Sequence, residues 1–129
     1  MKDEVFQWLK YAEENFKSSK LLRDEGLYNP CLQNVQQSVE KALKAVVVEN
    51  MLSFHRTHDI FKVKSLLSDN SIAVEISDDE CDFLNSIYLP SKYPLGSVLA
   101  DYEPDIEICD EAIAIALRVI DSVKHLLNA

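Results

Sequence analysis

Apolar residues recur at three- and four-residue steps along most of this chain, a spacing typical of helices that bury one face. The first stripe predicts a helix over residues 3–25, which Gly26 is suited to end. The second predicts a helix over residues 30–49, because Asn29 suits the N-cap and Pro30 the first helical position. We expect this second helix to bury Leu32, Val35, Val39, Ala42, Leu43 and Val46, and to turn Gln33, Gln36, Gln37, Glu40, Lys41 and Lys44 mostly elsewhere.

Two shorter helices follow in the pattern. One spans about residues 59–67, and Thr57 or His58 would sit at its start. The other opens at residues 77–80, whose Ser-x-x-Glu spacing is that of a capping box, and ends near Tyr88. The helical pattern therefore continues through the middle of the chain.

Residues 89–104 interrupt this pattern, because two internal prolines and a glycine predict an irregular loop. A last helix is predicted from near Pro104 to the C-terminus. Within it, residues 112–117 read AIAIAL and are apolar on more than one face. Either this helix is central in its own bundle, or it also contacts a second subunit. We expect the second arrangement, a dimer formed through this helix or its neighbours.

The predicted elements define an all-α protein. No strand of convincing length and no internal repeat is found, and 2 glycines and 4 prolines in 129 residues are few for a sheet-rich chain. We expect a single domain over residues 1–129, an up-and-down four-helix bundle with an additional short helix, in dimeric form.

Charge limits the partners of this chain. The formal net charge is −9, so the molecule as a whole would repel a polyanion, and a free-standing binder of duplex nucleic acid is disfavoured. Residues 54–64 are an exception, because Arg56, Lys62 and Lys64 outnumber Asp59 and give +2 with the histidines neutral. A local phosphate site or a basic partner is compatible with this distribution.

Cysteine usage and the chain start bear on location. Cys31, Cys81 and Cys109 are odd in number and widely spaced, which argues against a disulfide framework or a zinc knuckle and favours a reducing compartment. The charged start MKDEVFQW is not that of a signal peptide, and no apolar run approaches the roughly 18 residues of a membrane span. We expect a cytoplasmic protein without membrane contact.

Residues 28–67, YNPCLQNVQQSVEKALKAVVVENMLSFHRTHDIFKVKSLL, resemble the central signature of HEPN-domain proteins (higher eukaryotes and prokaryotes nucleotide-binding). Tyr28 precedes the helix, and the following loop ends in the Thr-His-Asp sequence of residues 57–59. SKYP at residues 91–94 resembles a serine-arginine-tyrosine-proline element, and a final helix with an acidic start follows. The helix positions that carry the resemblance are Gln36, Gln37, Glu40, Lys41, Lys44 and Ala45.

The resemblance implies a small helical bundle that forms a homodimer. Members of this family are commonly encoded beside a minimal nucleotidyltransferase, and the pair is often a toxin–antitoxin system. Some members are ribonucleases that need no metal and use an R-x(4–6)-H motif at the dimer cleft. We expect no cofactor.

The nuclease motif is not intact where the resemblance would place it. Lys92 stands in the arginine position, and Ser97 stands where a histidine would be wanted. Cleavage through a 2′-hydroxyl needs an acid–base group that titrates near neutrality, which serine lacks, and lysine lacks the bidentate fork of arginine. A literal match lies on the last helix, where Arg118 and His125 share one face, although so loose a pattern often arises by chance.

Arg56 and His58 are candidates for binding a nucleotide or RNA phosphate. They stand beside the predicted helix start at Asp59, where unpaired backbone N–H groups would suit a phosphate unless Asp59 itself satisfies them. In the alternative, Thr57 caps the helix and His58 packs or hydrogen-bonds against neighbouring helices. We favour that structural role for Thr57 and His58.

Lys92 and Tyr93 are two further candidates on the Lys-Tyr-Pro segment. They would bind a nucleotide by charge and stacking, or Tyr93 would instead anchor the loop to the bundle. We expect no metal site, because His55 and His58 are three residues apart but no third ligand has a recognisable spacing.

Three functions remain in view. The leading one is a homodimeric HEPN-type protein, inactive or weakly active as a nuclease, that binds nucleotide or RNA phosphate near Arg56 and Lys92 and partners a minimal nucleotidyltransferase. The second is an enzyme, a metal-independent endoribonuclease toxin that uses Arg118 and His125. The third is a helical scaffold that binds only protein.

Overall fold

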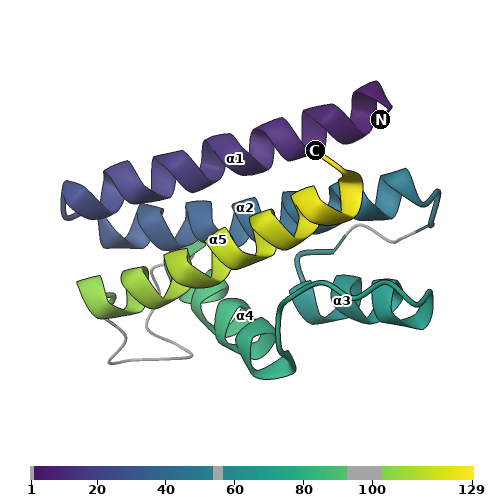
Figure 1. Ribbon diagram of the computed structural model, residues 1–129. Coiled ribbons are helices and arrows are strands. Elements are labelled where there is room, and N and C mark those ends of the chain that lie inside the picture. The colour runs from purple at the N-terminus through teal and green to yellow at the C-terminus, as the bar shows by residue number, and fades with distance from the viewer. Residues whose placement is uncertain (1, 54–56, 93–102) are drawn as a thin grey trace.

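A computed structural model of the protein describes residues 2–53, 57–92 and 103–129. Helices make up most of these ranges and no strand occurs in them, so the all-helical prediction is confirmed. The elements are α1 (Asp3–Asp24), α2 (Tyr28–Glu49), α3 (Ile60–Asp69), α4 (Asp78–Lys92) and α5 (Ile106–Leu127), as Figure 1 shows.

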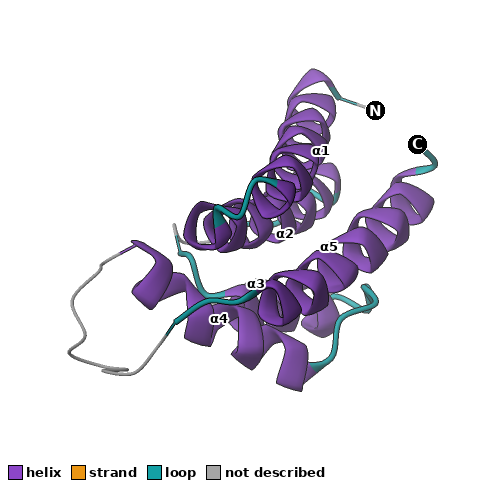
Figure 2. Ribbon diagram, turned by 90° about the vertical axis from the view of Figure 1, so that its left-hand side faces the viewer, coloured by secondary structure: helices purple, strands orange, loops and turns teal. Residues whose placement is uncertain are grey.

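Helix α2 is the centre of the bundle and packs against all four other helices. Helix α1 runs antiparallel along one side of α2, whereas α3 and α4 lie on the side away from α1 (Figures 1 and 2). Helix α4 crosses the long helices obliquely (Figure 1). The predicted apolar stripe of α2 is confirmed, because each of its members is at most 1% exposed: Leu32, Val35, Val39, Ala42, Leu43 and Val46.

The connection between α1 and α2 begins at the predicted glycine. Gly26 has a φ of +73°, and its N–H donates to the Arg23 carbonyl at 3.0 Å while that of Leu27 donates to the Leu22 carbonyl at 2.8 Å. These two bonds form a Schellman motif, which satisfies carbonyls that the helix end leaves open.

Helix α2 begins two residues earlier than predicted, at Tyr28. Leu27 occupies the N-cap position without a side-chain hydrogen bond, so the N-cap role predicted for Asn29 is wrong. Pro30 lies within the first turn, where backbone N–H groups have no partner inside the helix, and its ring therefore removes no helical hydrogen bond.

The start of α4 is confirmed and its end is not. Ser77 Oγ accepts from the Glu80 N–H at 3.0 Å, and Glu80 Oε1 accepts from the Ser77 N–H at 2.9 Å, which is the predicted capping box. The predicted end near Tyr88 is wrong, because the helix continues through Pro90 to Lys92. A proline inside a helix removes one backbone hydrogen bond and crowds the carbonyl four residues earlier, so the last turn of α4 is less stable than an uninterrupted turn.

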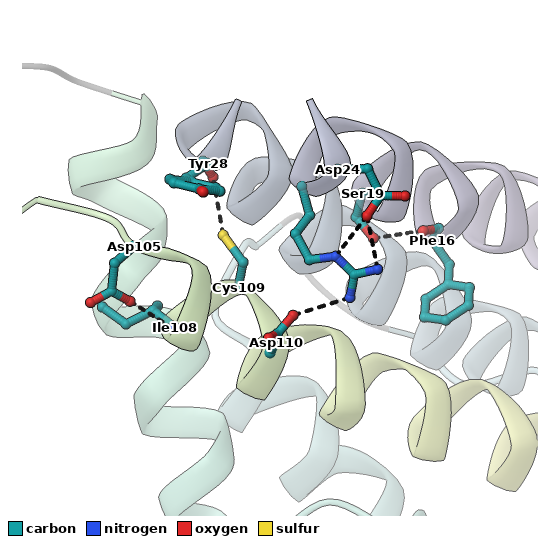
Figure 3. A network of polar contacts seen from close by, with 9 residues as sticks. Phe16, Ser19, Asp24, Tyr28, Asp105, Ile108, Cys109 and Asp110 are labelled. Carbon is teal, nitrogen blue, oxygen red and sulfur yellow. Dashed lines mark hydrogen bonds and ion pairs between the residues drawn. The ribbon is translucent and has the colours of Figure 1, made fainter. Parts of the chain in front are cut away.

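Helix α5 begins at Ile106, two residues after the predicted start. The reason is the Asp105 side chain, whose Oδ1 accepts from the Ile108 N–H at 2.8 Å and so forms the N-cap (Figure 3). Asn128 closes the other end in the left-handed conformation, with a φ of 57°.

The apolar run of α5 is mostly accounted for by the core of this chain. Ile113 and Ile115 are 7% and 4% exposed, and within the run only Ala114 and Leu117 reach the surface. The burial favours the central-helix explanation of the run, and a dimer contact through α5 would have to use its few exposed apolar positions. No helix in the described ranges is both long and apolar enough to cross a membrane.

Candidate functional site around Glu40 and His58

Four polar residues of α2 lie inside the bundle, and three of them form a row along one face. Gln36, Glu40 and Lys44 recur at four-residue steps and are 0%, 5% and 9% exposed. The prediction that these residues lie mostly away from the core is therefore wrong. The cause is the central position of α2, whose contacts with all four other helices cover its polar face as well.

Glu40 and Lys44 form a buried ion pair. Lys44 Nζ lies 2.6 Å from Glu40 Oε1, and the same ammonium lies 5.4 Å from the centre of the Trp8 ring. Removing two charges from water is costly unless they neutralise each other and keep their hydrogen bonds. Glu40 neutralises the Lys44 ammonium and accepts its hydrogen bond, and the Trp8 ring provides a further favourable contact.

The second oxygen of the same carboxylate contacts a histidine. His58 Nδ1 lies 3.1 Å from Glu40 Oε2, and Gln36 Nε2 donates to the His58 carbonyl at 3.1 Å. The His58 side chain is 56% exposed, whereas that of Glu40 is 6% exposed. Glu40 therefore holds the imidazole from inside in one orientation while much of the ring faces solvent.

The start of α3 is capped by Asp59 rather than by Thr57. Asp59 Oδ1 accepts from the Lys62 N–H at 3.3 Å and from Asn85 Nδ2 at 2.9 Å, and the Ile60 N–H donates to Asn85 Oδ1 at 3.1 Å. Thr57 Oγ1 accepts from the Asp59 N–H at 3.0 Å, one step before the helix. The predicted cap at Thr57 is wrong, because Asp59 is nearer to the first turn and reaches it directly.

This arrangement bears on the predicted phosphate site. The N–H groups of Ile60 and Lys62 already have side-chain acceptors, and the Asp59 carboxylate places negative charge at the same point. A phosphate would compete with that carboxylate for the end of α3. The terminus of α3 is therefore not an open phosphate site, and a phosphate ligand in this region would need side chains to bind it.

The other sequence candidates lie at the edges of the described chain. Lys92 is the last residue of α4. Position 92 is seven residues, or two turns, beyond Asn85, and lies on the same face of α4 about 10 Å further along. Arg56 and Tyr93 lie outside the described residues, as does Ser97.

Arg118 and His125 line one groove of about 620 Å³ beside α5, but the arginine is already bound. Its guanidinium makes a two-pronged contact with the Glu80 carboxylate and also donates to the Glu75 carbonyl at 3.2 Å. The hydrogen bond to Arg118 lowers the pKa of Glu80 to about 2. Arg118 therefore joins α5 to the capping box of α4, a structural task.

The cysteines are buried thiols. Burial, and next the neighbouring Cys109 thiol, raises the pKa of Cys31 to about 12, and burial raises that of Cys81 to about 11. Cys109 Sγ lies 3.7 Å from the Tyr28 carbonyl, where α5 meets the start of α2 (Figure 3). No group of three or more His, Cys, Asp or Glu side chains in the described part of the chain could hold a metal ion.

Sequence reasoning missed the network that fixes residues 57–59, which we call the His58 loop. Gln36 of α2 donates to the His58 carbonyl, and Asn85 of α4 contacts the Asp59 carboxylate and the Ile60 N–H. Gln36 was expected to lie mostly away from the core, and Asn85 was assigned no role. One signal was present: Gln36, Glu40 and Lys44 are polar at four-residue steps beside a fully apolar stripe. Asn85 carries no comparable signal, because its partner lies 26 residues away in the chain.

The fold and this site define a small all-α protein with a buried polar row on its central helix. The HEPN domain family model matches residues 5–126, and the chain belongs to that family. The crystal structure of ST0689, an archaeal HEPN homologue, is 25% identical with a TM-score of 0.70, and the match covers 98% of both chains.

A second structural relative is TT1696 from Thermus thermophilus. It is 22% identical with a TM-score of 0.77, and the match covers 96% of this chain and 98% of that one. At this identity the likeness shows the shared fold alone. No functionally curated protein matches the sequence.

Proposed function

We propose that this HEPN-domain protein binds nucleotide or RNA phosphate on the surface made by the His58 loop and the end of α4. The observation that carries the proposal is the position of His58. Its imidazole is fixed by the buried Glu40 carboxylate, yet the side chain is 56% exposed. A histidine that served packing alone would bury its ring, whereas an oriented and accessible ring suits a ligand contact.

Basic residues lie close to this histidine in the sequence and at the end of α4. Arg56 precedes it by two residues in the net-positive stretch 54–64, and position 92 lies on the face of α4 that carries Asn85, which contacts the same loop. In a chain of net charge −9, such a local concentration of basic residues is the feature that would attract a phosphate.

Binding of a fluorescently labelled single-stranded RNA, followed by anisotropy, tests the proposal. Arg56→Ala and Lys92→Ala should each weaken binding several-fold and leave thermal stability nearly unchanged. The matched control is Lys2→Ala, because Lys2 is also exposed and has no side-chain cap bond. Equal affinity of all three variants and the wild type would refute the proposed surface.

We also propose that the protein does not cleave RNA. Lys92 and Ser97 replace the arginine and histidine of the nuclease motif, and the alternative Arg118 is engaged by Glu80. Purified protein in EDTA at about pH 7 should therefore leave labelled RNA intact. The endoribonuclease function would instead be supported if the wild type cleaved RNA, the His125→Ala variant did not, and the Ser97→Ala variant still did.

The proposed biological unit is a cytoplasmic homodimer that partners a minimal nucleotidyltransferase in a toxin–antitoxin type system. Family membership supports this part of the proposal. Native mass measurement of the protein co-expressed with the product of the adjacent gene tests it, and a two-component complex is expected. A complex that forms without any RNA binding by the protein would favour the scaffold function.

A further inference from the structure

The groove that Arg118 and His125 line lies between α5 and residues 73–75 of the segment joining α3 to α4, and we call it the Glu75 groove. Five of the residues that line it are apolar: Ala73, Val74, Ala114, Leu117 and Leu126. Val74 is 7% exposed, whereas Leu117 and Leu126 are 48% and 39% exposed. An apolar hollow with large side chains open to solvent is a candidate contact surface.

Hydrogen bonds hold the two sides of the Glu75 groove together. The Glu75 N–H donates to Ser122 Oγ at 3.0 Å, and the Arg118 guanidinium donates to the Glu75 carbonyl at 3.2 Å. Both backbone polar groups of Glu75 are thus bound to α5. The groove therefore exists before a partner arrives, and binding does not have to order it.

The α5 side of the Glu75 groove is elongated. It extends from Ala114 to Leu126, which is about 18 Å along the helix axis, or roughly three turns. Ala73 and Ala114 are small and exposed, so side chains of a partner can enter between the larger residues. These dimensions suit a helical segment of another protein better than a compact small molecule.

The charge around the Glu75 groove is negative. The groove is lined by Glu75, Asp121 and Arg118, and Arg118 is paired with Glu80. These three acids and one base give −2 with His125 neutral. The exposed side chains of Glu75 and Asp121 form no ion pair within residues 2–53, 57–92 and 103–129. Two carboxylates are therefore open to the cations of a partner.

A second groove, of about 650 Å³, borders α5 on its α1 side and shares Leu117 and Asp121 with the first. Its lining carries both signs of charge: Lys10, Lys17, Lys20 and Lys124, and Glu13, Glu14 and Asp121. Because the two signs are mixed, charge selects no class of partner for the groove between α1 and α5. The Glu75 groove does select one.

We propose that the Glu75 groove binds a basic amphipathic helix of a partner protein. The apolar side chains of that helix pack on Leu117 and Leu126, and its lysines or arginines meet Glu75 and Asp121. A chain of net charge −9 attracts any basic segment at long range, so the apolar contacts are what favour this groove over the rest of the surface. The groove is separate from the proposed phosphate surface, since His58 does not line it.

A synthetic peptide of leucine and lysine, about four helical turns long with its leucines on one face, is the probe for this groove. Its binding is followed by fluorescence anisotropy at about 0.15 M salt, where long-range attraction is screened. The wild type should bind it several-fold more tightly than a peptide of the same composition whose leucines are spread over all faces. Equal binding of both peptides, or tighter binding of a leucine and glutamate peptide, would overturn the proposal.

Two variants locate the bound peptide, each with a matched control. Asp121→Lys should weaken binding several-fold, whereas Glu25→Lys makes the same change of charge at an exposed residue outside the groove and should bind almost as wild type does. Leu126→Ser should also weaken binding, whereas Leu21→Ser, at a residue of α1 that is 58% exposed, should not. Circular dichroism checks that all four variants are folded.

Two results would assign the Glu75 groove differently. Wild-type affinity in both Asp121→Lys and Leu126→Ser would place the peptide elsewhere on the molecule and overturn the proposal. Sedimentation velocity of the same proteins without peptide examines a competing occupant. An oligomer of the wild type that Leu126→Ser dissociates and Leu21→Ser retains would assign the groove to a second copy of this chain, which would also overturn it.

Discussion

At the residue scale, the Glu40 carboxylate is the central group of the candidate site. Glu40 is shared between Lys44, which is buried with it, and His58, which is mostly in water. The two partners depend on Glu40 to different degrees, because a buried ammonium without a counter-ion is far more costly than an exposed imidazole without one. Glu40 therefore contributes both to the stability of the core, through Lys44, and to the orientation of His58 at the candidate surface.

Removal of the Glu40 carboxylate should separate these two roles. Glu40→Ala removes the carboxylate that lies 2.6 Å from the buried Lys44 ammonium, and we expect a loss of about 3 kcal/mol or more in the free energy of unfolding. His58→Ala should cost only about 1 kcal/mol, because that side chain is half exposed. Urea unfolding at pH 7 measures both, and equal losses would contradict the ranking.

The pair of Arg118 and Glu80 predicts a pH dependence. Arg118 lowers the pKa of Glu80 from 4.5 to about 2, so the folded chain binds that proton more weakly than the unfolded chain does. The stabilisation is complete above pH 4.5 and is lost as the pH falls toward 2. The unfolding free energy of Arg118→Gln should lie below wild type by on the order of 1 kcal/mol at pH 6, since both groups are partly exposed.

That difference should shrink at pH 3, where Glu80 of the variant is protonated in both folded and unfolded chains. Urea unfolding of the two proteins at pH 6 and pH 3 checks the trend. A gap that widens on acidification would contradict the assigned partner of Glu80.

At the scale of the elements, helix ends separate what was predictable from what was not. Gly26 and the box of Ser77 and Glu80 were predicted correctly, because each signal lies within a few residues of the chain. The start of α3 was misassigned because Asp59 and Thr57 are both good cap residues, and Asn85 from another helix helps to fix the outcome. Local sequence cannot report a partner that far away.

Helix α2 also shows which features local sequence predicts and which depend on the packing of other helices. Its apolar positions follow from helical spacing, whereas the burial of Gln36, Glu40 and Lys44 follows from the packing of four other helices around α2. The four-residue spacing of Glu40 and Lys44 is that of a helical ion pair, but nothing local in the sequence indicates that His58 would share the carboxylate. The sequence thus indicated which types of residue the candidate site contains, but not which of them contact each other.

Gly26 offers a test of one element boundary. Its φ of +73° is strained for other residues, yet a Cβ built at this position meets no atom within 4 Å. Gly26→Ala should therefore lower the unfolding free energy by about 1 kcal/mol through backbone strain alone. Gly26→Asn should cost less, because asparagine tolerates this conformation better, and thermal unfolding of both variants checks the order.

At the scale of the whole molecule, the candidate site and the groove between α1 and α5 lie on different faces. Helices α3 and α4, which hold the candidate site together with α2, lie on the side of α2 away from α1 (Figures 1 and 2), whereas the groove is lined by residues of α1 and α5. A molecule bound at one of these faces would therefore leave the other accessible.

The salt dependence of RNA binding tests the central claim most directly, because each phosphate contact adds a fixed amount to the slope of log affinity against log salt. For single-stranded RNA, removing one contact should reduce that slope by about 0.7. We predict this reduction for Arg56→Ala and for Lys92→Ala, and an unchanged slope for Lys2→Ala. Slopes that are the same in all four proteins, or no binding of RNA by the wild type at low salt, would contradict the account.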